Sequence, residues 1–444
     1  MYDLRAPPNG GATAAVFGCI GTPASRYGDG EVEQATVRAA GSRRPPATTT
    51  RAGIVFVAGV LLLALNLRPA VTAVPSILEE IGSQLHYSGV MLTVVTTIPV
   101  LCFAVFSPVA GWIGRRFGDE RGLATAIAAV AAGQILRALA PGGGFITGTV
   151  ISTAGIALMN VLLSSLVKRR APERAAHLLG AYLAMLYVGA MLGSAISVPL
   201  YHLGHRSIAL PLGVWAAPAV LAFLLWLPQL GSHTVPDPAG RSAAVQLRRS
   251  SLAWSVTVFM GLQSLTYYGS LSILPDLYRS RGLDPATAGL VNTMLSVGGV
   301  ITAVSAPVLV ARFGVGRQVL VGSAIISVLA TVAPLFVPLG AALPLAFLLG
   351  LGQGVSIALA LYFIMARAAT PTVAGALSGM AQGTGYLIAT AGPLATGLLH
   401  TGTGSWAASI GLLATLTAAT LWFGLLSDRD AVITEDGRTV LGPS

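Results

Sequence analysis

A single arginine stands deep inside the first long apolar run of this sequence. Arg68 lies about 15 residues into the run 53–76, roughly 22 Å along a helix that rises 1.5 Å per residue. A guanidinium buried at that depth usually marks a solute path or a paired charge; the alternative is an arginine that reaches out to lipid headgroups. Asn66 and Pro69 flank it, and the proline can break the helix and free a carbonyl. We expect Arg68 to face a central cavity and to contact an anionic or strongly polar group.

Other polar side chains lie inside later apolar runs, where a solute or a neighbouring helix could use them. Hydrogen bonding between helices is the competing role for each one. Gln353 belongs to the glycine-rich stretch 350–354, which suits close helix packing rather than a dinucleotide loop, because no strand precedes it. Together with Arg68, the predicted solute-binding residues are Asn66, Asn160, Tyr267, Gln353, Tyr362 and Gln382.

Acidic and histidine side chains avoid the middle of the apolar runs. Glu79, Glu80 and Asp276 stand at one end of their runs, and His177 stands at the other end. Carriers that relay protons usually bury a carboxylate or a histidine for the purpose, so we expect no proton shuttle on a side chain of this protein. No nucleophile–base–acid set, metal-ligand cluster or P-loop is visible, so we predict no enzyme, no catalytic residues, no metal and no cofactor.

The elements that must position these side chains are membrane spans. Of the 444 residues, 54% are hydrophobic and only 9% are charged, whereas soluble domains carry about 25% charged residues. Runs of roughly 20 apolar residues, long enough to cross about 30 Å of hydrocarbon, recur along the chain. The predicted spans are residues 53–76, 88–111, 121–140, 145–167, 178–200, 208–228, 251–275, 286–311, 317–337, 343–365, 373–399 and 405–427.

Polar segments divide the chain and orient it. Residues 1–50 are predicted to form a disordered cytoplasmic tail, 51–228 and 251–427 two six-helix bundles, 229–250 a cytoplasmic linker and 428–444 a second cytoplasmic tail. Arginine collects in one set of alternating loops, which places those loops and both termini in the cytoplasm. We assign the net charge of +10 to this bias and not to nucleic-acid binding, because no basic stripe with interleaved aromatic residues occurs. The candidate gating residues of these loops are Arg115, Arg116, Lys168, Arg169 and Arg312.

The two halves of the sequence repeat each other. Residues 155–180 align without gaps on residues 354–379, and Pro172 in a loop meets Pro371. Because the loop matches are not apolar, the general likeness of apolar helices does not explain them. Parallel repeats of six spans, with the solute site between the halves, are the architecture of major facilitator carriers. We therefore predict an all-α polytopic membrane protein with about twelve transmembrane helices in two six-helix parallel repeats.

Short motifs make the resemblance more specific. The residues Leu-Asn-Leu-Arg-Pro at 65–69 resemble the first-helix signature of the cyanate/2-nitroimidazole transporter-like (CynX/NimT) branch of the major facilitator superfamily. Further segments similar to that branch are 160–163, 168–169, 172–174, 274–275, 281–283, 288–289, 352–354 and 357–361. The resemblance covers about residues 53 to 427 and implies a twelve-helix carrier for small, often anionic or weakly acidic, polar molecules. The superfamily usually has an aspartate just before the arginine pair of the helix 2–3 loop; here Asp119 follows that pair, so the charge lock between halves is not carried over.

These features predict a monomeric secondary transporter or facilitator in the cytoplasmic membrane, which moves a small anionic or weakly acidic polar solute by alternating access. Its expected partners are that solute and the lipid bilayer. Efflux of drug-like compounds is an alternative, although a cationic drug would favour a buried carboxylate. A transport-inactive membrane sensor or scaffold is an alternative of another class; it would need a large soluble effector segment, and only 1–50 and 229–250 are available.

Overall fold

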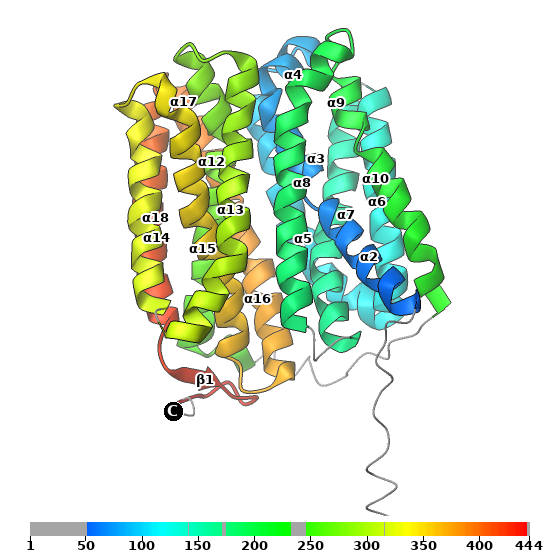
Figure 1. The fold of residues 1–444 in the computed structure, drawn as a ribbon, viewed down its shortest axis with the longest axis vertical. Helices are drawn as coiled ribbons and strands as arrows, with labels where there is room; N and C mark the ends of the chain where they lie inside the picture. Colours follow the sequence, from blue (N-terminus) through cyan, green and yellow to red (C-terminus); the bar gives the residue numbers. More distant parts are fainter. Residues whose placement is uncertain (1–50, 141, 171–174, 232–245, 315, 442–444) are drawn as a thin grey trace, which may run out of the picture. The chain divides into compact units, whose positions relative to one another are not determined.

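Long α-helices that run between two ends make up most of the structure (Figure 1). The computed structural model describes residues 51–140, 142–170, 175–231, 246–314 and 316–441. The predicted tail 1–50 and most of the predicted linker 229–250 lie outside these residues. In the orientation of Figure 1, we call the end that carries α4 the upper end and the end that carries β1 the lower end.

The N-terminal half begins with a broken helix. Its elements are α2 (Arg51–Leu65), α3 (Pro69–Ser76), α4 (Leu78–Leu85), α5 (Gly89–Phe117), α6 (Asp119–Leu139), α7 (Gly143–Arg170), α8 (Ala175–Leu203), α9 (Ala209–Gly213), α10 (Ala216–Trp226) and the 3₁₀ turn η2 (Leu227–Gly231). The first predicted span is thus divided between α2 and α3, and the sixth between α9, α10 and η2.

The C-terminal half repeats this plan and ends in a hairpin. Its elements are α12 (Ser251–Ser280), α13 (Pro285–Phe313), α14 (Gly316–Val332), η3 (Ala333–Leu335), η4 (Leu339–Ala341), α15 (Ala342–Ala366), α16 (Pro371–Ala389), α17 (Ala391–Thr403), α18 (Trp406–Ser427), β1 (Ala431–Ile433) and β2 (Thr439–Leu441). The two strands are antiparallel, and Ile433 is fully buried where it bridges to Ala368 at the lower end.

Ten segments among the described residues are long and apolar enough to cross a membrane. The two predicted spans outside this group are 251–275 and 373–399, which nevertheless form α12 and the pair α16–α17. Both are more polar than their neighbours, and both pack against the N-terminal half: α12 contacts α3, while α16 and α17 contact α5. A helix shielded from lipid by two halves does not need an apolar surface all round, so these less apolar segments lie where a solute site is expected.

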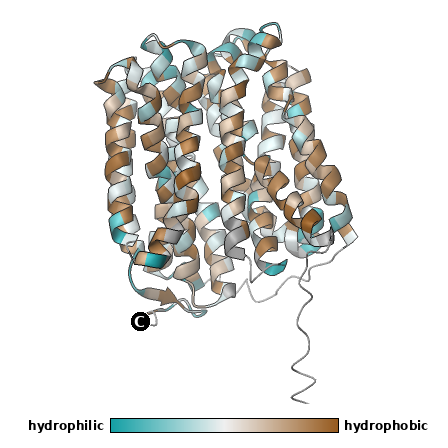
Figure 2. Ribbon diagram, viewed as in Figure 1, coloured by the Kyte–Doolittle hydropathy of each residue, from teal (hydrophilic) through white to brown (hydrophobic). Residues whose placement is uncertain are grey.

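The outer faces of the bundle are apolar. Large side chains such as Leu139 and Trp422 are 77% and 64% exposed, and Figure 2 shows hydrophobic residues along the length of the helices. A surface of this kind would aggregate in water. Lipid is therefore the medium that matches the exposed faces of these helices.

Glycines bring α13 and α15 into backbone contact. A Cβ atom added to Gly350 would lie 2.0 Å from the carbonyl oxygen of Leu295, and one added to Gly298 would lie 2.4 Å from that of Phe347. Small residues at such positions allow the close approach on which helix association in membranes depends. The glycine-rich stretch 350–354 therefore serves packing, as its sequence predicts.

We expect Gly350→Ala to destabilise the protein by about 1–3 kcal/mol, because α13 and α15 must move apart to admit the methyl group. Thermal unfolding in detergent measures the effect. Gly322→Ala in α14 is the matched control, since an added Cβ there meets nothing within 4 Å. Equal melting temperatures for the two variants would contradict the close packing of α13 and α15.

Candidate solute-binding site

The first membrane helix is interrupted beside Arg68. α2 ends at Leu65 and α3 begins at Pro69, with Arg68 as the non-helical residue before the proline, at φ −122° and ψ −34°. Proline is well tolerated at the first position of a helix, where its missing N–H would have no partner. The break that the sequence predicts at Pro69 is confirmed, and it places Arg68 at the N-terminus of α3.

Polar contacts from neighbouring helices hold this break in place. Asn66 Nδ2 donates to the carbonyl oxygens of Leu62, at 2.8 Å, and of Pro218 in α10, at 3.2 Å. Thr72 Oγ1 donates to the carbonyl oxygen of Ala190 in α8, at 3.0 Å. Asn66, predicted to bind solute, thus uses its amide nitrogen on backbone carbonyls and stabilises the turn that presents Arg68.

A second arginine supports the same turn from α6. Arg137 Nη1 donates to the carbonyl oxygen of Ala70 at 2.9 Å, and the side chain is 1% exposed. Its Nε and Nη2 atoms have no hydrogen-bond partner, nor does Oε1 of Gln134 one turn earlier. Among the described residues no carboxylate forms an ion pair with Arg137. A buried charge with so little compensation is costly, and its one described hydrogen bond is to the broken helix.

Arg68 points from the N-terminal half onto two tyrosines of the C-terminal half. Its Nη1 atom donates to the hydroxyl oxygen of Tyr268 at 2.5 Å. The guanidinium carbon lies 5.3 Å from the ring centre of Tyr267 and 5.2 Å from that of Tyr268. Tyr386 in α16 and Tyr187 in α8 also lie within electrostatic range of the guanidinium. The negative faces of aromatic rings attract a cation most strongly where water is scarce. We call these four tyrosines the tyrosine cage, and it stabilises the charged form of Arg68.

The cage leaves the positive charge available. Arg68 remains partly accessible, although Tyr267 and Tyr268 are buried. Its hydrogen bond to Tyr268 uses one of five guanidinium N–H groups. In the described part of the chain no acidic side chain forms an ion pair with it. A planar anionic group can therefore meet the remaining N–H groups in the bidentate geometry that guanidinium favours.

The other predicted site residues lie at varying distances from this centre. Gln353 Nε2 donates to Ser270 Oγ at 3.4 Å, two residues along from Tyr268. Asn160 Oδ1 accepts a hydrogen bond from Tyr182 at 2.8 Å. Gln382 Nε2 donates to a serine within α16, and Tyr362 packs against a phenylalanine of α15. The structure thus brings Tyr267 onto Arg68 and Gln353 near it, while Gln382 and Tyr362 have no described contact with Arg68.

Sequence reasoning undervalued the aromatic partners and missed Arg137. Tyr268 and Tyr386 are visible as tyrosines inside apolar runs, but only the fold shows that they surround Arg68. Phe103 completes the group, with its ring centre 6.0 Å from that of Tyr268 and 5.3 Å from that of Tyr386. A signal for Arg137 was present, because it is a charged residue inside the predicted span 121–140.

An ionic latch joins the two halves at the upper end. Arg279 of α12 contacts Glu80 of α4 through two nitrogen–oxygen pairs of 3.1 Å, and it contacts Glu79 at 2.6 Å. Asp276 stands one turn before Arg279, and its Oδ1 atom is buried without a hydrogen-bond partner. We call these four residues the upper latch. A small pocket between the halves is lined by residues of α3, α5 and α12, including Val71 and Tyr268.

The upper latch contains three carboxyl groups for one guanidinium. Asp276 follows the predicted span 251–275. Burial first, and then the charge of Glu79, raise its pKa, Arg279 opposes the rise, and the net result is a pKa of about 7. A raised pKa means that the closed latch favours protonated Asp276. As the pH rises from the ordinary carboxyl range near 4 through about 7, the closed latch therefore loses stability relative to an open, hydrated one.

We expect spin labels at Ser83 and Ser280, both exposed near the latch, to move apart as the pH rises through about 7. Double electron–electron resonance measures this distance in lipid nanodiscs. Asp276→Asn removes the titrating charge and should give one distance at all of these pH values. A pH response that survives in Asp276→Asn would assign the effect to another group.

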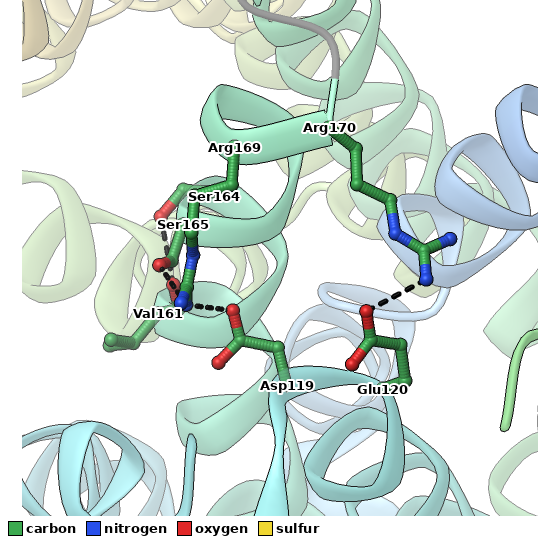
Figure 3. Close-up of polar contacts among 7 residues, drawn as sticks. All are labelled: Asp119, Glu120, Val161, Ser164, Ser165, Arg169 and Arg170. Atoms are coloured by element: carbon green, nitrogen blue, oxygen red, sulfur yellow. Dashed lines mark hydrogen bonds and ion pairs between the residues drawn. The ribbon is translucent and has the colours of Figure 1, made fainter. Parts of the chain in front are cut away.

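The ion pairs described at the lower end each lie within a single half. Arg169 pairs with Asp119, and Arg170 pairs with Glu120 at 2.7 Å, so the end of α7 is tied to the first turn of α6 (Figure 3). The two arginines lie at the C-terminus of α7 and the two acidic residues at the N-terminus of α6, so each charge is opposite in sign to the dipole at its helix end. Asp119, which follows the arginine pair in the sequence, thus forms an ion pair within the N-terminal half. Of the ion pairs among described residues, only those of the upper latch cross between the halves.

The remaining predicted gating residues make no described contact across the halves. Arg116 is exposed and lies over the rings of Trp112 and Phe117. Arg312 is exposed and lies over the ring of Phe313. The side chains of Arg115 and Lys168 lie outside the described residues. Their proposed role in gating therefore stays a prediction.

Comparison with known proteins agrees with this architecture. The profile of the Major Facilitator Superfamily matches residues 54–271 and, again, residues 256–440. The chain is 36% identical over 383 residues to the 2-nitroimidazole transporter of Escherichia coli (strain K12), which covers 86% of this chain and 97% of the relative. It is 25% identical over 348 residues to the cyanate transport protein CynX of the same organism, and the match covers 78% of this chain and 90% of that relative.

A solved structure shares the fold at low sequence identity. The crystal structure of a D-xylose-proton symporter superposes with a TM-score of 0.66 at 16% identity, over 87% of this chain and 99% of that one. The repeated profile match, the 36% identical relative and the shared fold agree with the two-half architecture. The chain therefore belongs to the major facilitator superfamily, in its cyanate/2-nitroimidazole transporter-like branch, a group of membrane transporters of small solutes.

Proposed function

We propose that the protein moves a small, flat, anionic or weakly acidic solute across the cytoplasmic membrane by alternating access. The observation that carries this proposal is the position of Arg68, a partly exposed residue whose guanidinium is held between the halves on Tyr267 and Tyr268 without an acidic partner among the described residues. Arg68 binds the charged end of the solute, and the tyrosine rings contact its flat faces.

The chemistry of the relatives supports a flat solute. A nitroimidazole is a planar aromatic molecule with a nitro group, and cyanate is a small linear anion. Both present oxygen or nitrogen acceptors with negative charge density, which suits a guanidinium. A cationic solute would be repelled by Arg68, since no carboxylate lies near it in the described part of the bundle.

The two ends of the structure differ in how the halves are joined by ion pairs, and this difference supports alternating access. The upper latch links the halves through Arg279, Glu79 and Glu80, whereas the described ion pairs of the lower end lie within single halves. In this conformation we expect the solute site to communicate with the lower end. That end carries the arginine-rich loops, so we propose that it faces the cytoplasm.

Uptake into proteoliposomes tests the proposal. The panel should hold labelled 2-nitroimidazole, cyanate and a flat aromatic carboxylate, each beside a neutral or saturated analogue of similar size. We expect saturable, protein-dependent uptake of at least one flat anion or nitro compound and none of a permanent cation. Transport of cations, or of large drug-like compounds alone, would contradict the proposed solute class. No transport by folded protein would favour a sensor or scaffold.

A further inference from the structure

A second polar pocket lies inside the C-terminal half, away from Arg68. It is enclosed by α12, α14, α15 and α18 and admits only a water-sized guest. Its polar lining consists of six hydroxyl side chains and two amide side chains, and none of the residues that line it is charged. The hydroxyl groups belong to Thr266, Ser323, Ser327, Ser356, Thr417 and Thr420. The pocket therefore gathers eight uncharged polar side chains inside the C-terminal half.

Most of these hydroxyl groups can only accept hydrogen bonds in the pocket, because each already donates its proton to a carbonyl oxygen of its own helix. Thr417 Oγ1 and Thr420 Oγ1 each donate to a carbonyl oxygen four residues earlier in α18, at 2.8 Å. Ser356 Oγ donates in the same way within α15, at 3.1 Å. Thr266 and Ser323 donate to carbonyl oxygens three residues earlier, at 3.0 and 2.8 Å. Donation of the proton leaves an oxygen that can only accept, and it also strengthens that oxygen as an acceptor.

The two amides add carbonyl oxygens to this set. Gln263 Nε2 donates to the carbonyl oxygen of Met260 and to Ser264 Oγ, at 3.1 and 2.6 Å. Gln353 Nε2 donates to Ser270 Oγ. Oε1 of Gln353 and Oγ of Ser327 are both buried and have no hydrogen-bond partner. Ser327 and Gln353 are only 2% and 5% exposed, so bulk water does not satisfy these atoms, and buried polar groups without partners are rare.

A pocket lined mostly by acceptors suits a cation, which all of the oxygen atoms can bind at once. A water molecule would use its two protons on two of these acceptors and could accept a hydrogen bond from Ser327, so it is the alternative occupant. Calcium and magnesium call for carboxylate ligands, and the pocket lining has none. A small monovalent ion needs only neutral oxygen ligands, and transporters of other folds hold sodium through such oxygens. We propose that this pocket is a sodium-ion site whose ligands include Ser327, Gln353 and Thr417.

Gln353 connects the pocket to the solute site. Its Oε1 belongs to the sodium ligands, and its Nε2 contacts Ser270, two residues from the Tyr268 that holds Arg68. Bound sodium orders this amide and adds a positive charge on the C-terminal side of the site between the halves, where an anionic solute is expected. Sodium and solute therefore increase each other's affinity by the same factor. This coupling rests on the proposed function, whereas the sodium site itself does not.

Thermal stability tests the site without any solute. The purified protein is heated in sodium, potassium or choline chloride at equal ionic strength. We expect sodium alone to raise the melting temperature progressively with its concentration, since a ligand that binds only the folded state stabilises it. Thr417→Val and Ser327→Ala should fold but lose this response. Thr415→Val is the matched control, because Thr415 makes the same bond within α18 yet is exposed on the outer face.

Each outcome decides the inference. Equal melting temperatures in the three salts overturn the sodium site and leave a buried water as the occupant. A sodium response that survives in both Thr417→Val and Ser327→Ala also overturns it. Solute uptake that is saturable but indifferent to sodium overturns the coupling and leaves the proposed function standing. A sodium-dependent melting temperature without solute uptake supports the site and contradicts the proposed function alone.

Discussion

Arg68→Ala is expected to lower solute uptake by roughly 30-fold or more, because truncating one partner of a buried charged pair costs about 2–5 kcal/mol. Arg68→Lys keeps the charge but loses the planar fork and the stacking on tyrosine rings, so it should recover only a small part of the activity. Initial uptake rates over a range of solute concentrations in proteoliposomes measure both effects. Lower affinity and lower maximal rate are both expected, since the residue lies where the two halves meet.

The control for Arg68 is an arginine outside the bundle. Arg438 lies in the C-terminal hairpin with an 84% exposed side chain, so Arg438→Ala should transport normally. Each variant must first show the melting temperature and chromatographic profile of folded protein. If folded Arg68→Ala took up the solute as fast as wild type, Arg68 would be a structural residue and the anionic solute class would lose its main support.

Arg137→Met is expected to fold normally and yet to lose uptake by about tenfold or more. Replacing a poorly compensated buried charge with an apolar side chain of similar length is often neutral or stabilising, so the melting temperature should stay equal or rise. Transport should fall, because the carbonyl oxygen of Ala70 loses its contact with α6 and the turn that presents Arg68 becomes looser. Displacements of about 1 Å at a reacting or binding group can reduce rates by 100-fold.

Two further measurements separate positioning from a purely structural role. Arg137→Lys can still donate to the carbonyl oxygen of Ala70, so it should recover part of the uptake. The affinity for the solute should weaken in Arg137→Met without any loss of thermal stability. An unfolded Arg137→Met would instead assign the residue to the fold, and normal uptake by this variant would show that the turn needs no support from α6.

Hydropathy predicted the fold because a chain that crosses the bilayer must satisfy its own backbone hydrogen bonds, which an apolar helix does. A span is a helical segment of about 20 residues, so each apolar run of the sequence corresponds to one helix or to a divided helix of the structure. The helix break at Pro69 was also predictable, since proline lacks a backbone donor. Arg68 stood out for the same reason: a charge among apolar residues needs a function to explain it.

Contacts between distant residues needed the tertiary structure. Arg68 and Tyr268 are 200 residues apart in the sequence, and their approach depends on how the two halves pack. The relatively polar α12 and α16 were visible as weaker spans, but polarity alone does not distinguish a solute contact from a bond between helices. Asn66 shows the difference, because its neighbour Pro218 is known only from the fold.

Charge pairing was likewise decided by three-dimensional packing. The sequence predicted arginine-rich loops at one end, and it could not predict that Asp119 would pair with Arg169 inside one half while Arg279 bridges the halves at the other end. The direction of each side chain depends on helix rotation and crossing, which apolar runs of similar hydropathy do not specify. The sequence by itself determined the spans, the break and the depth of Arg68 in the first span; the packing of the helices decided what surrounds that arginine and which end of the bundle is latched.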